Sequence, residues 1–192
     1  MRFSLSDLKD PLVKGHPLHA ILTDLPIGAL VLGSACDMLG LATHQPEWRF
    51  AARAAHSGAL LSGAAAALIG LWDYQAVPRE HAARRVGALH GYLNGGALAL
   101  LLASLTLRRA SRAPKNGQPN PAAVALSSAA LATITISGWL GGELVFHLGW
   151  RVVPAEHAEQ IEDALRARGD NTLIEQAHNT VRDYERAHAL IP

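Results

Sequence analysis

Histidine and acidic side chains recur near the ends of otherwise apolar stretches of this sequence. Two pairs have helical spacing: His90 precedes Asn94 by four residues, and Glu143 precedes His147 by four. Residues four apart lie on the same face of an α-helix. Imidazole and carboxylate groups are ligands for zinc, iron, copper and manganese. These residues could therefore bind a transition metal ion, or two of the imidazoles could bind a haem iron.

Four long apolar segments must position these side chains, and they cover residues 20–41, 54–72, 86–107 and 122–146. At about 1.5 Å per residue, each segment can cross about 30 Å of hydrocarbon as an α-helix. The second and third segments contain no Asp, Glu, Lys or Arg. A helix of a soluble bundle needs a polar face, so the sequence predicts four transmembrane helices instead.

The overall composition agrees with a membrane protein. Hydrophobic residues make up 49% of the 192 residues and charged residues 17%, whereas a soluble domain has about 25% charged residues. The formal net charge is only +1 and no basic stripe is present, and both observations argue against nucleic-acid binding. The only cysteine is Cys36, which excludes an internal disulfide. The first residues lack the apolar stretch of a cleavable signal peptide.

We predict an all-α fold with two parts. Residues 1–152 form an antiparallel four-helix transmembrane bundle, and residues 153–192 form a short, acidic, amphipathic helical C-terminal tail. The alternative for the tail is a solvated segment without a packed face. Four spans alternate in direction, so both termini lie on one face of the membrane, which we call side A; the opposite face is side B.

Side A collects most of the polar side chains. An ionisable group near hydrocarbon costs several kcal/mol unless it is paired or ligated, so such groups tend to be functional. The candidate metal ligands on side A are His16, His19, Asp24, Asp73, His90, Glu143 and His147. Side B holds Asp37, His44 and His56, and we expect Asp37 to pair locally or to cap a helix.

Three interpretations of side A remain open. In the first, His19, His90 and Glu143 bind a transition metal ion, and a neighbouring acid or histidine completes the site. In the second, His19 and His90 on facing helices bind a haem b. In the third, the polar groups bond only to one another and to the backbone at helix ends.

Three stretches of the chain together resemble a known family. They read GHPLH followed by TDLPIG, WD followed by RRVGALH, and GWLGGELVF. In this order they resemble the DUF2231 family of predicted bacterial integral membrane proteins, over about residues 12–152. The resemblance implies a four-span membrane protein but no established activity. Some relatives carry a fused Rieske iron–sulfur domain, which implies a link to electron transfer. This chain lacks the Cys and His pairs of such a domain, so any redox role would need a separate partner protein or a site in the membrane.

We therefore expect a multi-pass membrane protein that binds a metal ion or haem near side A and is linked to electron transfer. The alternatives are a non-catalytic membrane scaffold that recruits a partner through its C-terminal tail, and a small transporter or proton conduit. We do not expect an enzyme, because the common nucleotide-binding and hydrolase motifs are absent from the sequence. We expect the bacterial inner (plasma) membrane and cytoplasmic termini, although Lys and Arg residues are nearly balanced between the two sides.

Overall fold

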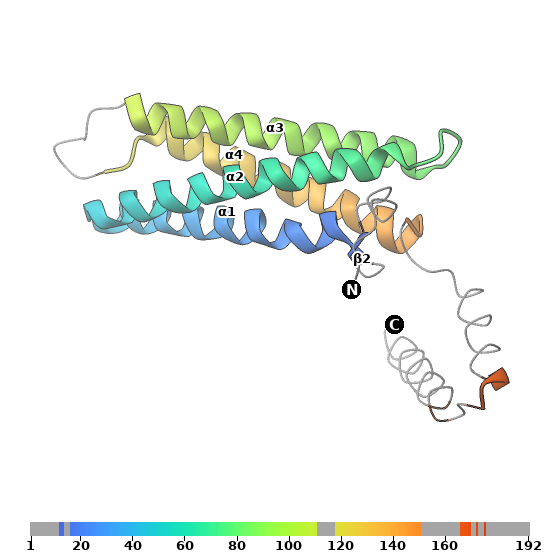
Figure 1. Cartoon of the computed structure of the whole chain (residues 1–192). Helices are drawn as coiled ribbons and strands as arrows, with labels where there is room; N and C mark the ends of the chain where they lie inside the picture. Colours follow the sequence, from blue (N-terminus) through green and yellow to red (C-terminus); the bar gives the residue numbers. More distant parts are fainter. Residues whose placement is uncertain are drawn as a thin grey trace, which may run out of the picture. The chain divides into compact units, whose positions relative to one another are not determined.

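The computed structural model describes residues 12–13, 16–110, 118–150, 166–169, 172 and 175 of the chain (Figure 1). The chain divides into two compact units, residues 1–151 and residues 152–192. The four long helices all belong to the first unit. The predicted tail falls almost entirely outside the described residues, so its amphipathic helices and its role in recruiting a partner stay predictions.

The first unit consists mainly of four long helices, which lie side by side in Figure 1. They are α1 (Leu18–Thr43), α2 (Pro46–Gln75), α3 (Ala83–Ala110) and α4 (Pro121–Gly142), and the short π-helix η2 (Glu143–His147) continues α4. Two strands of two residues each, β1 (Leu12–Val13) and β2 (His16–Pro17), pair in antiparallel register before α1. The prediction of four apolar helices of membrane-spanning length is confirmed. The small strand pair was not predicted.

The helices begin and end where local chemistry satisfies their free backbone groups. The Asn120 side chain accepts hydrogen bonds from the backbone nitrogens of Ala122 and Ala123, at 2.9 and 3.2 Å, and Pro121 occupies the first turn of α4. At the end of α1, His44 adopts the left-handed conformation with φ 59°, and its N–H donates to the Gly40 carbonyl. With these caps, the helices extend beyond the apolar segments that the sequence marked out.

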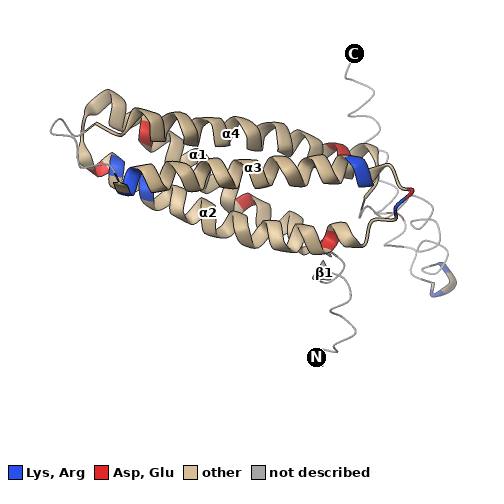
Figure 2. Cartoon of the chain, turned by 90° about the horizontal axis from the view of Figure 1, so that it is seen from above, with Lys and Arg blue, Asp and Glu red and all other residues tan. Residues whose placement is uncertain are grey.

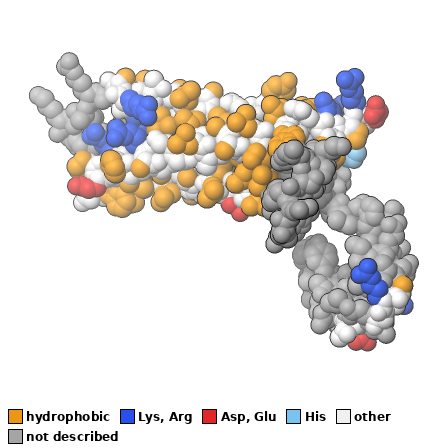
Figure 3. Space-filling view, viewed as in Figure 1, with side chains coloured by type: hydrophobic (Ala, Val, Ile, Leu, Met, Phe, Trp, Pro, Cys, Tyr) orange, Lys and Arg blue, Asp and Glu red, His pale blue; other side chains and the backbone are white. Residues whose placement is uncertain are grey.

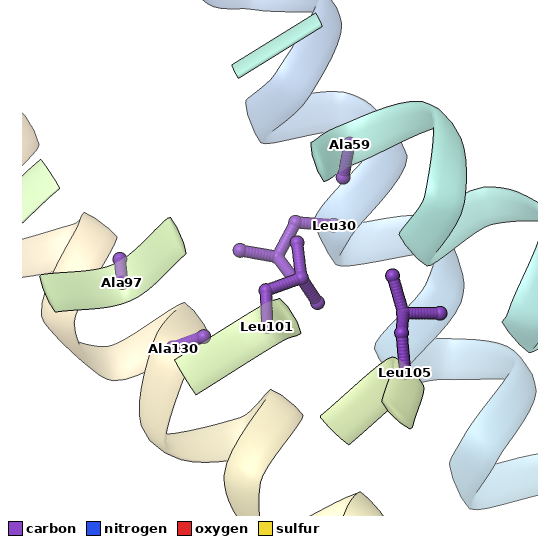
Figure 4. Packing of buried hydrophobic residues seen from close by; sticks show 6 residues of the cluster. All are labelled: Leu30, Ala59, Ala97, Leu101, Leu105 and Ala130. Carbon is purple, nitrogen blue, oxygen red and sulfur yellow. The ribbon is translucent and has the colours of Figure 1, made fainter. Parts of the chain in front are cut away.

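The interior is built from small side chains and a few leucines. Among the helices, α1 packs mainly against α2 and α3 mainly against α4. The buried apolar cluster joins all four helices (Figure 4), and its members are Leu30, Ala59, Ala97, Leu101, Leu105 and Ala130. Alanine lets helix backbones approach closely, which is the main source of packing energy between helices in lipid.

The large apolar side chains point outward. Leu61, Leu68 and Trp139 are exposed by 73%, 71% and 70%, and hydrophobic side chains are spread along the whole visible face of the helices (Figure 3). Lys and Arg gather toward the two ends of the helices (Figure 2). Large exposed apolar surfaces of this extent mark contact with a membrane or a partner rather than with water.

We expect the full-length protein to sediment with membranes and to remain there after washing with alkaline carbonate. The reason is that, outside a membrane, the outward leucines and aromatic residues of its four apolar helices would be exposed to water. Immunoblotting of the pellet and supernatant measures this, with a peripheral membrane protein as the control that the wash releases. Recovery of monodisperse protein from the supernatant without detergent would contradict the prediction.

Candidate functional site

Two imidazole rings from different helix pairs lie close together. His19 lies at the start of α1 and His90 in the first half of α3. Their ring centroids are 6.1 Å apart and their planes are nearly perpendicular, at 86°. Both residues are half-buried. We call them the imidazole pair.

Each ring of the imidazole pair is fixed by a backbone carbonyl of the neighbouring helix. His19 Nδ1 lies 2.9 Å from the Ala66 carbonyl oxygen on α2, and His90 Nδ1 lies 2.8 Å from the Ser137 carbonyl oxygen on α4. A carbonyl can only accept, so Nδ1 must donate in both rings and Nε2 carries the lone pair of the neutral imidazole. The Asn94 side-chain amide lies 2.9 Å from His90 Nε2 and donates to it.

Glycines make room for both rings. A Cβ atom at Gly70 would lie 2.7 Å from the His19 ring, and one at Gly141 would lie 3.3 Å from the His90 ring. Any larger residue at Gly70 would therefore push the His19 ring out of place. The two histidines are seated in the same way, each against a glycine of the helix that also supplies the carbonyl.

A second polar cluster lies further along the same helices. Asp37 on α1 and Arg108 on α3, 71 positions apart in the sequence, form a two-pronged ion pair: Nη1 donates to Oδ1 at 2.7 Å and Nη2 donates to Oδ2 at 2.6 Å. The side chains of Asp37 and Arg108 are only 1% and 7% exposed. Paired, parallel hydrogen bonds of this kind are among the strongest in proteins.

The other two helices complete this cluster. His56 on α2 donates from Nε2 to Asp37 Oδ2 at 3.1 Å, and Ser127 on α4 accepts from Arg108 Nη2 at 3.0 Å. Ser104 accepts from Arg108 Nε at 3.2 Å. We call these five residues the ion-pair cluster. It connects all four helices, and within the described residues its one buried side-chain atom without a hydrogen bond is His56 Nδ1.

The seats of the two histidines are related by a repeat within the chain. The interval of 71 positions that separates the two ion-paired residues also separates His19 from His90 and Gly70 from Gly141. Both histidine-to-carbonyl hydrogen bonds connect residues that are 47 positions apart. The α1–α2 pair and the α3–α4 pair therefore place equivalent residues in equivalent surroundings.

Core residues follow the same interval of 71 positions. Leu30 corresponds to Leu101 and Ala59 to Ala130, and all four are buried members of the apolar cluster. Matching identity and matching burial at this spacing show that the repeat extends along the helices. The chain thus contains two similar halves, an arrangement also found in transporters with parallel repeats.

The remaining predicted ligands are dispersed. Glu143 and His147 bond to each other within η2, with Nδ1 and Oε2 2.5 Å apart, and the His147 side chain is 74% exposed. Asp73 is buried and accepts a hydrogen bond from Trp150 Nε1 at 3.4 Å. Asp24 is exposed on α1. Each of these acids therefore has surroundings different from those of the imidazole pair.

Within the part of the chain that the structure describes, no three His, Cys, Asp or Glu side chains are arranged to hold a metal ion. The side chain of His16 lies outside that part. Of the seven candidate ligands, the structure thus brings together His19 and His90, and separately Glu143 and His147. The wider ligand set stays a prediction.

Sequence reasoning missed the ion-pair cluster. Asp37 was expected to pair locally or to cap a helix, but its partner Arg108 is 71 positions away on another helix. Arg108 follows the third apolar segment directly, and its position alone does not show that its side chain reaches back between the helices. A search for internal repeats would have aligned Asp37 with Arg108 and His56 with Ser127.

Comparison with known proteins gives one match. The sequence model of the DUF2231 family, described as a predicted membrane protein, matches residues 15–154. No curated protein and no solved structure matches the chain. The matched range contains both the imidazole pair and the ion-pair cluster, and it agrees with the resemblance seen in the sequence.

We expect Gly33→Ala to destabilise the protein. A Cβ atom at Gly33 would lie 2.5 Å from His56 Nδ1, and the fully buried ring has little room to move. Overpacking of this kind costs about 1–3 kcal/mol. The matched control is Gly28→Ala on the same helix, where a Cβ atom meets nothing within 4 Å. Thermal unfolding in detergent should show a lower midpoint for Gly33→Ala only; equal midpoints would show that the packing is not tight.

Proposed function

This chain belongs to the DUF2231 family of predicted membrane proteins, and we propose that it binds a haem between His19 and His90 and takes part in electron transfer within the membrane. The observation that carries the proposal is the imidazole pair, with its ring centroids 6.1 Å apart. Two imidazole rings at this separation could both bind one metal centre.

The donor set favours a haem over a bare metal ion. Zinc takes about four protein ligands in a structural site and three in a catalytic site. The described residues offer two imidazoles and no arranged third ligand. A haem brings four nitrogen ligands of its own and needs only axial ligands from the protein. Two histidines are therefore enough for a haem, while they leave a free ion incompletely coordinated.

The surroundings of the two rings also support a metal ligand role. Histidines that bind metals usually donate their other ring nitrogen to a carbonyl or carboxylate, which fixes the ring orientation. His19 and His90 both donate from Nδ1 to a carbonyl, so Nε2 is the nitrogen of each ring that could bind a metal. The Asn94 amide now occupies His90 Nε2 and would have to give up that bond. A bound haem would supply a one-electron redox centre.

The proposal includes a placement in the membrane. We propose that the four helices cross the plasma membrane of a bacterium in alternating directions, with cytoplasmic termini, and that a separate redox protein meets the face nearest His19. Two residues separate α1 from α2, which supports a reversal of direction there. Between Asp24 and Asp37, α1 carries no charged side chain. The helix rises by about 20 Å over this stretch, less than the hydrocarbon thickness of about 30 Å, which supports a position of Asp37 inside the bilayer.

We expect the protein purified in detergent from haem-supplied cells to show a Soret band and about one iron per chain. His19→Ala and His90→Ala should lose the band, because each removes one of the two histidines that would hold the haem. The control is His44→Asn, at an exposed position whose left-handed backbone asparagine tolerates. Absorption spectra and elemental analysis measure the outcome. Bound metal without a Soret band would favour a metal ion, and neither metal nor band would remove the proposal.

We also expect Gly70→Ala to weaken haem binding without touching a ligand. The new Cβ atom would lie 2.7 Å from the His19 ring and displace it from the Ala66 carbonyl. Gly58→Ala is the matched control on the same helix, because a Cβ atom there meets nothing within 4 Å. Haem titration of the purified proteins should show weaker binding for Gly70→Ala alone. Equal affinities would argue that the seat of His19 does not matter for binding.

A further inference from the structure

We infer that the Asp37–Arg108 ion pair specifies how the two halves of the chain associate, so that an α1–α2 pair accepts an α3–α4 pair and rejects a second copy of itself. This inference is independent of the haem proposal. It concerns the ion-pair cluster, which contains neither histidine of the imidazole pair.

Because of the repeat, an α1–α2 pair could associate either with an α3–α4 pair or with a second α1–α2 pair. The two halves have equivalent core residues, such as Leu30 with Leu101 and Ala59 with Ala130. In lipid, apolar surfaces do not distinguish one helix from another, because the lipid tails are equally apolar. Two α1–α2 pairs from different chains could therefore pack through much the same surface as one α1–α2 pair and one α3–α4 pair.

The opposite charges of residues 37 and 108 distinguish the two halves from each other. These residues occupy equivalent positions in the two halves and meet each other, with Arg108 Nη2 2.6 Å from Asp37 Oδ2. If two copies of one half met in the same way, two carboxylates or two guanidinium groups would face each other. Like charges at this distance in a low-dielectric interior repel strongly, and only the pairing of Asp37 with Arg108 brings opposite charges together. Specificity through repulsion of the wrong partner is common at natural interfaces.

The positions around the ion pair differ between the halves in a matching way. His56 bonds to Asp37, and its equivalent Ser127 bonds to Arg108. Gly33 makes room for the His56 ring, and its equivalent Ser104 instead accepts from Arg108 Nε. Each half thus carries a complete set of residues suited to its own charge. A buried polar group that fixes a pairing is the best-attested role of such groups.

The test uses full-length chains with the charges changed. In D37R two guanidinium groups meet, and in R108D two carboxylates meet. We expect each variant alone to lose its monodisperse peak in detergent and to melt at a lower temperature than the wild type.

Producing the two variants together, with different affinity tags, restores opposite charges between chains. The guanidinium group at position 37 of the D37R chain can pair with the carboxylate at position 108 of the R108D chain. The unchanged Arg108 of the first chain can likewise pair with the unchanged Asp37 of the second. We expect the two chains to copurify in equal amounts, whereas two differently tagged wild-type chains do not.

A second variant separates partner choice from simple loss of stability. It exchanges all three pairs of equivalent residues in one chain, as D37R, R108D, H56S, S127H, G33S and S104G together. Because the halves are equivalent, this variant should regain a monodisperse peak and a melting temperature close to that of the wild type. Copurification or this recovery supports the inference. It is overturned if D37R and R108D are each as stable and monodisperse as the wild type, or if neither copurification nor recovery is seen.

Discussion

A carboxylate buried among apolar helices has to be neutralised, and the structure satisfies that requirement at Asp37. On insertion scales a lone aspartate at the centre of a membrane helix costs about 3 kcal/mol. Arg108 balances the charge, and the donor groups of His56 and Ser127 surround the pair from the other two helices. No helix can shift along its axis without separating one of these contacts. The ion pair therefore fixes the register of all four helices at one point.

That register also determines how His19 and His90 lie relative to each other at the other end of the helices. His19 precedes Asp37 by the same number of positions as His90 precedes Arg108. Both separations correspond to about 27 Å of helix. Two stretches of equal length that meet at the ion pair also bring their histidines to the same height. The imidazole pair is thus a consequence of the repeat together with the contact between Asp37 and Arg108, and its hydrogen bonds to backbone carbonyls only set the ring orientations.

The sequence predicted the helices well because only long apolar stretches can cross hydrocarbon as helices. A stretch such as residues 54–72, without a charged residue, is typical of such a helix and of few other structures. It also singled out His19 and His90. It could not predict the contacts across helices, because spacing along one helix fixes only which residues share its face. Glu143 lies in η2 and bonds to His147 four residues later, and spacing along one helix does not show which side chains of other helices lie near it. Arg108 was missed for a related reason: its position marks a helix end, but its long side chain reaches back into the interior.

The imidazole pair and the ion-pair cluster both join the two halves, but they differ in what they need. At the ion-pair cluster, unlike groups meet, and the carboxylate of Asp37 and the guanidinium group of Arg108 neutralise each other. At the imidazole pair, like groups meet, and two neutral imidazoles that both donate from Nδ1 to carbonyls have no hydrogen left for each other. The repeat is broken at this point: Asn94 donates to His90 Nε2, whereas its equivalent Thr23 donates to the Ala20 carbonyl.

The asymmetry between the two rings bears on what could bind there. The lone pair of His90 is satisfied by a side chain of its own helix. The hydrogen bond of His19 within the described part of the chain uses Nδ1 and leaves Nε2 available. Nε2 of His19 would therefore bind a metal centre shared by the two rings more readily than Nε2 of His90 would. A metal centre bound between the rings would join the halves at a contact where their side chains do not complement each other.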